Sequence, residues 1–216
     1  MRIFTFARKE KKLSSKTKHV RDKWRGKAWY MIIAPSFFGN VELGSVPAEE
    51  DEKLIGRVVE ATLYDITGDF SHMYLKMYFQ VNEIDGKTAK TQFKGHEYSR
   101  DYLRSLVRRR TTKVDGLFTL TTKEGYKLRI AVSALTLSRI KTSQEKIIRK
   151  LMDRIVKEKA AALTLDQFVQ EVVLGKIASD IYNEAKKVAP LRHIGIRKSK
   201  LIGEPAKPQV QEIQPA

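Results

Sequence analysis

The chain has 216 residues, with 42 Lys and Arg against 25 Asp and Glu, and its formal net charge at pH 7 is +17. A hydrophobic fraction of 42% is enough to build a packed core, so the chain is not a disordered basic tail. The absence of cysteine excludes a disulfide scaffold and Cys-based zinc sites. No apolar run reaches membrane-spanning length, and no apolar stretch follows the basic residues 1–12 as it would in a signal peptide. A compact body with this charge favours a polyanionic partner, most often nucleic acid.

Residues 1–28 are predicted to form a basic, extended arm. Eleven Lys and Arg residues precede Tyr30, and only Glu10 and Asp22 oppose them, so the arm should become ordered only on its partner. Trp24 can stack on an unpaired base, whereas Trp29 and Tyr30 are expected to anchor the arm to the core. The candidate RNA-binding residues of the arm are Arg8, Lys9, Lys11, Lys12, Lys16, Lys18, Arg21, Lys23, Trp24, Arg25 and Lys27.

Residues 29–140 are predicted to form a β-rich core domain. The segment 29–34 reads as a strand that Pro35 ends, and the acidic segment 41–53 reads as a loop. Apolar residues alternate along 73–81, which indicates a half-buried strand. Further strands are expected at 58–66, at 88–93 after the Asp85-Gly86 turn, and on both sides of the Glu124-Gly125 turn within 116–132. These strands favour a mostly antiparallel, barrel-like sheet, and therefore an α+β fold.

An inserted helix is predicted after Ser99, with the cations Arg108, Arg109 and Arg110 at its C-terminal end. The helix dipole alone favours cations there, but three consecutive arginines cannot share one face, so at least one should face an anionic surface. Residues 141–202 are predicted to be a helical region packed on the core, with capping boxes at Thr142/Glu145 and Thr164/Gln167. Residues 203–216 are predicted to be a flexible tail. Further candidate RNA-binding residues are Lys146, Arg149, Lys150, Arg197, Lys198 and Lys200.

No catalytic or metal-binding constellation is present in the sequence patterns. The four histidines have no metal-ligand spacing. The tripeptide Gly86-Lys87-Thr88 ends like a phosphate-binding loop, but Val81 stands where its leading glycine should be. The sequence has neither G-x-S-x-G nor H-E-x-x-H. We therefore expect a binding protein with no cofactor and no metal, and not an enzyme.

Six short motifs, in one order along the chain, carry a resemblance to a known family. They are Trp29-Tyr30 with Ala34-Pro35 and Phe38; Gly56-Arg57-Val58 with Glu60, Leu63 and Asp65; Phe93, Gly95, Arg100 and Asp101; Thr121-Thr122 with Gly125-Tyr126 and Leu128-Arg129; Thr142-Ser143 with Arg149-Lys150; and Gly175-Lys176-Ile177 with Asp180-Ile181, Pro190-Leu191 and Arg197-Lys198. This pattern, over about residues 23–201, resembles the archaeal and eukaryotic small-subunit ribosomal protein family S3Ae (eS1 in unified naming). The ends do not match the longer eukaryotic extensions, so the chain is most similar to archaeal members.

The resemblance implies a structural protein of the small (30S) ribosomal subunit, seated on the platform near the mRNA exit. Its implied partners are small-subunit rRNA and neighbouring platform proteins, with mRNA and initiation factors as further candidates. It implies a cytoplasmic, ribosome-bound location and no membrane contact. Two other readings stay open at this point: a free-standing RNA-binding regulator or RNA chaperone found off ribosomes, and an enzyme acting on RNA, which would need turnover.

Overall fold

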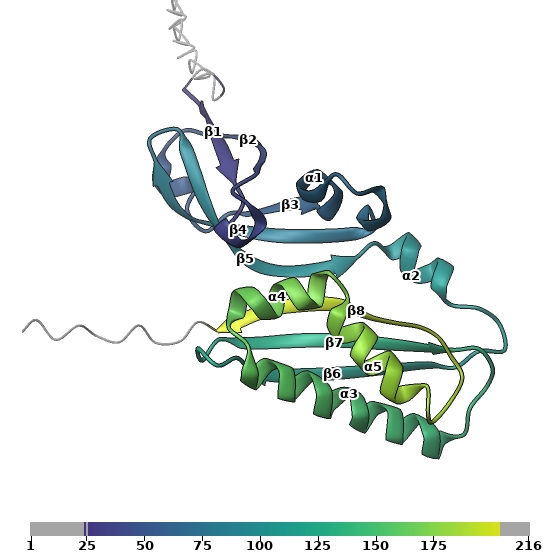
Figure 1. Cartoon of the computed structure of the whole chain (residues 1–216). Coiled ribbons are helices and arrows are strands. Elements are labelled where there is room, and N and C mark those ends of the chain that lie inside the picture. Colours follow the sequence, from purple (N-terminus) through teal and green to yellow (C-terminus); the bar gives the residue numbers. More distant parts are fainter. Residues whose placement is uncertain (1–23, 25, 204–216) are drawn as a thin grey trace, which may run out of the picture.

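The computed structural model describes residue Trp24 and residues 26–203, and these form an α+β fold, as predicted (Figure 1). The strands of this part of the chain are β1 (Ala28–Ile33), β2 (Glu42–Ala48), β3 (Val58–Thr62), β4 (Leu75–Asp85), β5 (Thr88–Tyr98), β6 (Lys113–Thr121), β7 (Lys127–Thr136) and β8 (Leu191–Gly203). The helices are α1 (Leu63–Thr67), α2 (Arg100–Leu106), α3 (Thr142–Ala162), α4 (Leu165–Val173) and α5 (Lys176–Ala185), with short 3-10 turns η1 (Ser36–Phe38), η2 (Asp51–Lys53) and η3 (Phe70–His72).

One sheet connects both halves of the molecule, and it does not close into a barrel. Its main order is β2-β1-β5-β8-β7-β6, and β4, with β3 beyond it, branches from β5. All described pairings are antiparallel except that of β1 with β5. Strand β5 is the link, because its start pairs with β1 and its end pairs with β8 through only three residue pairs. The upper and lower halves in Figure 1 therefore share one continuous strand.

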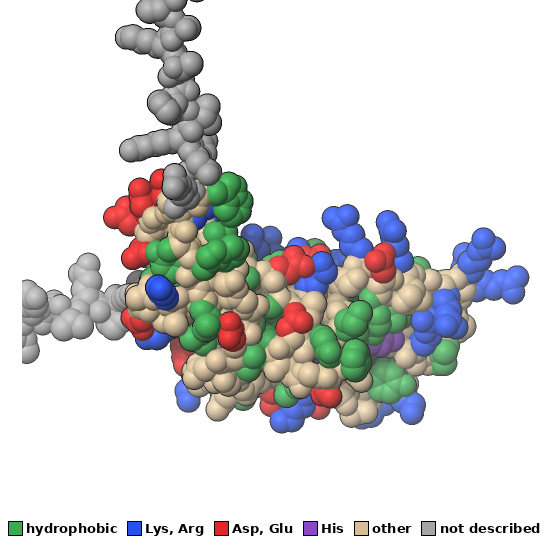
Figure 2. Space-filling view, turned by 90° about the horizontal axis from the view of Figure 1, so that it is seen from above, with side chains coloured by type: hydrophobic (Ala, Val, Ile, Leu, Met, Phe, Trp, Pro, Cys, Tyr) green, Lys and Arg blue, Asp and Glu red, His purple; other side chains and the backbone are tan. Residues whose placement is uncertain are grey.

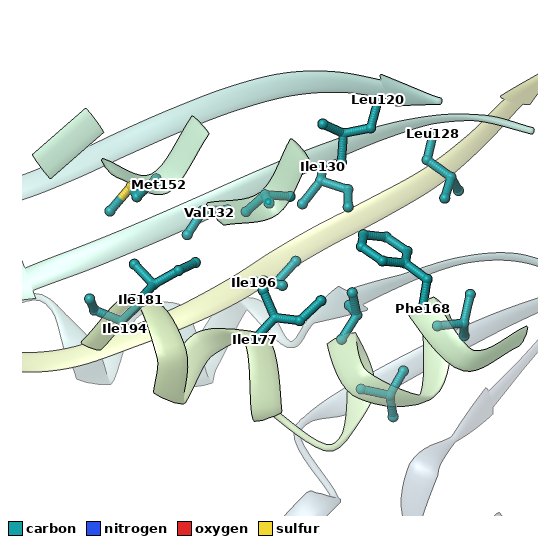
Figure 3. Close-up of a cluster of buried hydrophobic side chains, with 14 of the residues drawn as sticks. Leu120, Leu128, Ile130, Val132, Met152, Phe168, Ile177, Ile181, Ile194 and Ile196 are labelled. Carbon is teal, nitrogen blue, oxygen red and sulfur yellow. The ribbon is translucent and has the colours of Figure 1, made fainter. Parts of the chain in front are cut away.

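Helices α3, α4 and α5 cover one face of β6, β7 and β8, and the main core lies between these two layers (Figures 1 and 3). Apolar residues recur at three-to-four spacing along α3, so that Ile148, Met152 and Ile155 reach the sheet on one face of the helix. Phe168 from α4 is fully buried among them. A smaller second core, which includes Tyr30, Ile32, Leu54 and Val81, supports the β1–β2 hairpin.

The local patterns predict several elements correctly. Residues Leu75, Met77, Phe79 and Val81 are all buried on one face of β4, as their alternation predicts. Both predicted hairpin turns occur, and Gly86 and Gly125 adopt the positive φ angles of 60° and 89° that such turns need. The strand ended by Pro35 is β1.

The prediction of a loop over 41–53 was wrong, because residues 42–48 form strand β2. Pro47 lies within this strand, opposite Trp29. A proline cannot donate to a ladder, but β2 has β1 as its only described neighbour, so this edge position tolerates it. Of the acidic residues that suggested a loop, Asp51 and Glu52 belong to η2, just beyond the strand, and Glu50 is its N-cap.

The predicted strand over 58–66 ends at Thr62 instead, because a helix begins there. The Thr62 hydroxyl accepts from the Asp65 N–H and the Asp65 carboxylate accepts from the Thr62 N–H, and this capping box starts α1. The two capping boxes that we predicted in the last third do not form. Gln144 accepts from the Lys141 N–H at 3.1 Å, and Glu124 from the β6–β7 turn accepts from Leu165 N–H at the start of α4.

The predicted helical region 141–202 contains helices only as far as Ala185, and residues 191–203 form β8. This strand lies in the middle of the sheet, between β5 and β7. Its sequence does alternate near the end, since Ser199 and Leu201 are buried while Lys198 and Lys200 are exposed. The basic residues concealed this period of two. The β-rich core therefore includes residues from the chain's last quarter.

Candidate nucleic-acid interface

Three loops that are far apart in the sequence meet at one end of the molecule, at the right of Figure 1. They are the α2–β6 loop (107–112), the β7–α3 loop (137–141) and the α5–β8 loop (186–190). We call this surface the loop end. Hydrogen bonds join the three loops, so their relative positions are fixed by the fold.

Thr112 and Thr136 connect the first two loops. The Thr136 hydroxyl accepts from the Thr112 N–H at 2.9 Å and donates to the Ser138 carbonyl at 2.6 Å. The Ile140 N–H donates to the Thr112 hydroxyl at 3.3 Å. The third loop is joined to the second by the Leu137 N–H, which donates to the Pro190 carbonyl at 3.1 Å. Buried polar groups satisfied in this way hold a surface rigid.

The loop end carries seven exposed cations: Arg108, Arg109, Arg110, Arg139, Lys141, Lys186 and Lys187. Within the described part of the chain, none of them has an acidic partner within ion-pair distance. Seven unpaired cations at one end produce a strong positive potential, which suits a phosphate backbone.

The three consecutive arginines do not lie at a helix end, contrary to the sequence prediction. Helix α2 stops at Leu106, and Arg108, Arg109 and Arg110 follow in the loop. The helix dipole falls off within the last turn, so it does not account for them. Arg110 also has a φ angle of 62°, which is uncommon for a residue with a side chain. A polyanion contact explains these exposed residues better than the dipole does.

Sequence reasoning missed four of the seven cations, namely Arg139, Lys141, Lys186 and Lys187. Each belongs to a short basic segment between helices or strands, where a solvated charge is the ordinary interpretation. These four cations differ from ordinary solvated charges only because the fold brings them together at the loop end. The signal that was available is Pro190 after Lys186 and Lys187, because it marks a loop close to a helix end.

The three candidates on α3 divide into free and engaged cations. Lys146 and Lys150 are exposed, in the first turns of the helix, and no described carboxylate pairs with them. The Arg149 Nε donates to the Asp115 carbonyl at 2.9 Å, on the open edge of β6. Farther along, ion pairs hold the cations in place, as in Arg154 with Glu184 and Lys159 with Asp180. The unpaired charge of α3 is therefore concentrated near the loop end.

The candidates on β8 are mostly engaged within the sheet. Lys198 pairs with Glu97 at 2.8 Å, and Arg197 lies 4.0 Å from Asp115. Burial by itself would raise the pKa of the Asp115 carboxyl, but hydrogen bonds with Ser133 and Lys113 and the charge of Arg197 outweigh it and lower that pKa. Lys200 has no described ion-pair partner and remains available.

The candidate residues of the arm, apart from Trp24 and Lys27, lie outside the described residues. Trp24 is 63% exposed, and the Lys27 ammonium lies 4.1 Å from the centre of its ring. Trp29 is also exposed, at 60%, so the expectation that it anchors the arm in the core was wrong. Tyr30 does anchor there: it is buried, and its hydroxyl donates to Asp51 at 2.5 Å.

His96 stabilises the fold. His96 is fully buried at the β5–β8 junction, where its Nδ1 accepts from the Ser199 hydroxyl at 2.6 Å and its Nε2 donates to the Ile196 carbonyl at 2.9 Å. Burial lowers the pKa of His96 to about 4, so the imidazole is neutral at physiological pH.

Among the described residues, no group of three His, Asp or Glu could hold a metal ion. No described helix is long and apolar enough to cross a membrane.

Comparison with known proteins agrees with this geometry and with the ordered motifs. The model of the Ribosomal S3Ae family matches residues 15–205. The chain is 51% identical to a protein from Desulfurococcus amylolyticus named small ribosomal subunit protein eS1, over 85% of this chain and 86% of that protein. Proteins of the same name from Aeropyrum pernix (50% identity, 86% of this chain, 89% of the relative) and Sulfurisphaera tokodaii (47% identity, 90% of this chain, all of the relative) are also similar. The chain is thus a ribosomal protein and not an enzyme, and it belongs to the Ribosomal S3Ae family.

Proposed function

We propose that this chain is a structural constituent of the small ribosomal subunit and binds small-subunit rRNA on the platform near the mRNA exit. The names of the relatives support the assignment to the small subunit. The place on the platform comes from the family resemblance. The observation that carries RNA binding is the loop end, where three hydrogen-bonded loops present seven exposed cations without described acidic partners.

The proposed mechanism is an electrostatic clamp. Arg108, Arg109 and Arg110, together with Lys146 and Lys150, contact phosphates on one side of the RNA. The basic arm, including Lys23, Arg25 and Lys27, contacts it elsewhere, and Trp24 stacks on an unpaired base. Such contacts position the protein and carry no sequence information. The hydrogen bonds between the loops hold the backbone of the loop end in place before binding, so little backbone entropy is lost there when the RNA arrives.

The remaining partners and the location follow from this placement. The protein is bound to ribosomes in the cytoplasm, beside neighbouring platform proteins. Messenger RNA and initiation factors are candidate contacts at the exit. No cofactor takes part, and no membrane is involved.

Sedimentation of native lysate tests the proposal against the alternative of a free-standing RNA-binding regulator or chaperone. A structural constituent is expected in the small-subunit peak and should stay there after a moderate salt wash. A protein found mainly in the light fractions would contradict the proposal. The comparisons favour the first outcome, because the relatives are named as subunit proteins.

A further inference from the structure

One lobe of this basic protein is acidic. Residues 28–75 hold eight Asp and Glu but only two cations, Lys53 and Arg57, a net charge of −6 within a chain of net charge +17. This lobe comprises β1, β2, β3 and α1 with the three 3-10 turns. Seen from above, Asp and Glu side chains gather at the left of the molecule, whereas Lys and Arg project at the right (Figure 2). The charge of the described chain is therefore segregated between two ends.

The acidic lobe also exposes an apolar projection on α1 and η3. Phe70 is 75% exposed and Met73 is 61% exposed. The ring of Phe70 rests on the ring of Tyr64, with 4.7 Å between their centres. We call these three residues the α1–η3 knob. Single exposed apolar residues are normal on a protein surface, but Phe70 and Met73 are both exposed and lie beside the half-buried ring of Tyr64, which makes a patch of the kind that anchors protein interfaces.

The segment that carries the knob, residues 58–75, has only negative charges. No Lys or Arg occurs from Val58 to Leu75, and Asp65 and Asp69 have no described ion-pair partner. Glu60 is neutralised by Lys76 at 2.6 Å. Cations resume at Lys76 and on α2, which carries Arg100 and Arg104 and whose Tyr102 stacks on Tyr74 at 3.8 Å. The knob therefore belongs to a segment of the acidic lobe that is followed directly by cations.

We propose that the α1–η3 knob is a docking surface for a basic protein, a neighbour in the small subunit that presents an apolar pocket bordered by Lys or Arg. The ring of Phe70 fills the pocket, and Asp65 and Asp69 face the partner's cations. This proposal rests on the proposed function only for where the partner is found. It assigns the acidic lobe to protein and leaves the loop end to RNA.

Charge complementarity selects protein over RNA as the occupant. A base could stack on Phe70, but its flanking phosphates would then approach two carboxylates with no cation among residues 58–75 to balance them. A protein with an excess of Lys and Arg gains from the same carboxylates. Burying Phe70 and Met73 adds apolar contact, which phosphate and ribose do not supply.

Photo-crosslinking in assembled small subunits tests the proposal. The chain carries p-benzoylphenylalanine at position 70 or, as a matched control at the loop end, at position 109. The probe at position 70 is expected to crosslink to a protein of net positive charge, in a product that resists ribonuclease. The probe at position 109 is expected to crosslink to RNA. Crosslinks from position 70 to RNA, to this chain itself, or to nothing overturn the docking proposal, and failure at position 109 alone counts against the RNA site.

A pair of substitutions supplies a second measurement. Phe70→Ser should weaken retention of the partner protein, as identified by crosslinking, on salt-washed subunits about tenfold. The affinity of this chain for RNA should stay unchanged. Leu117→Ser is the control, since Leu117 is 67% exposed on β6, away from the knob. Both side chains are largely exposed, so both variants should fold. Equal retention in the two variants, or a matching loss of RNA affinity in Phe70→Ser, would refute the assignment.

Discussion

Replacing Arg108, Arg109 and Arg110 with Ala removes three of the seven unpaired cations of the loop end. Each phosphate contact contributes roughly 0.7–0.9 to the slope of log affinity against log salt concentration, so the slope should become shallower by about 2–3. Between about 50 and 200 mM salt, the wild-type affinity should therefore fall about 15- to 60-fold further than that of the variant. Folding should be unaffected, because the three side chains are exposed and have no described ion-pair partner.

Equilibrium titration of purified small-subunit rRNA over that salt range measures the two slopes. The matched control replaces Arg154, Lys157 and Lys159 with Ala, which removes the same charge from cations that are already ion-paired. If the clamp is at the loop end, the control keeps nearly the wild-type slope. An unchanged slope in the arginine variant, or equal slopes in both variants, would show that the loop end is an ordinary solvated surface.

Three further predictions concern the fold. Burial lowers the pKa of His96 to about 4 from its ordinary value of 6.5, so between these pH values the unfolded chain binds a proton that the folded chain does not. The free energy of unfolding is therefore at its full value above pH 6.5 and falls by about 3 kcal/mol towards pH 4. Denaturant titrations at several pH values should show this loss, and a His96→Gln variant should lack most of it. A Cβ atom on Gly95 would lie 2.3 Å from the Ser199 carbonyl oxygen, whereas one on Gly116 would meet the movable ring of Phe118, so Gly95→Ala should lower the thermal midpoint clearly more than Gly116→Ala does. Phe168→Ala should cost about 3–5 kcal/mol in the free energy of unfolding, since Phe168 is 1% exposed, and a cost below about 1 kcal/mol would contradict its place in the core.

Local sequence patterns predict those helices, strands and turns whose formation depends mainly on their own residues. The alternation in β4 and the glycines at both hairpin turns are sufficient, because each strand pairs with its neighbour along the chain. The capping box at Thr62 was also present in the sequence, but the β-forming residues around it suggested that the strand continued. Strand β8 could not be predicted in this way, because its partners are 55 (Thr136 to Leu191) to 105 (Gly95 to Lys200) residues earlier and its basic residues resemble a surface segment.

The candidate site follows the same rule. The three consecutive arginines are visible as a cluster in the sequence itself. The other four cations join this cluster only in the folded chain, where hydrogen bonds of Thr112 and Pro190 bring three loops together: Arg139, Lys141, Lys186 and Lys187. Conversely, Arg149 and Lys198 look free in the sequence and have partners inside the fold. Composition predicts how much positive charge there is, but only tertiary contacts determine how much of it remains for a partner.

The position of β8 connects these observations. It pairs with β7 along most of its length and with β5 through Gly95, His96 and Glu97, so it joins the acidic lobe to the half that carries the loop end. No side chain fits at Gly95, and the neutral ring of His96 is bonded to two residues of β8, so this short junction is tightly specified. Since β8 (Leu191–Gly203) forms this junction, the two charged ends take their relative positions only after these residues have paired with strands far earlier in the sequence. Both proposed contacts, RNA at the loop end and a basic neighbour at the acidic lobe, depend on that relative position, because β8 is the described strand that pairs with both β5 and β7.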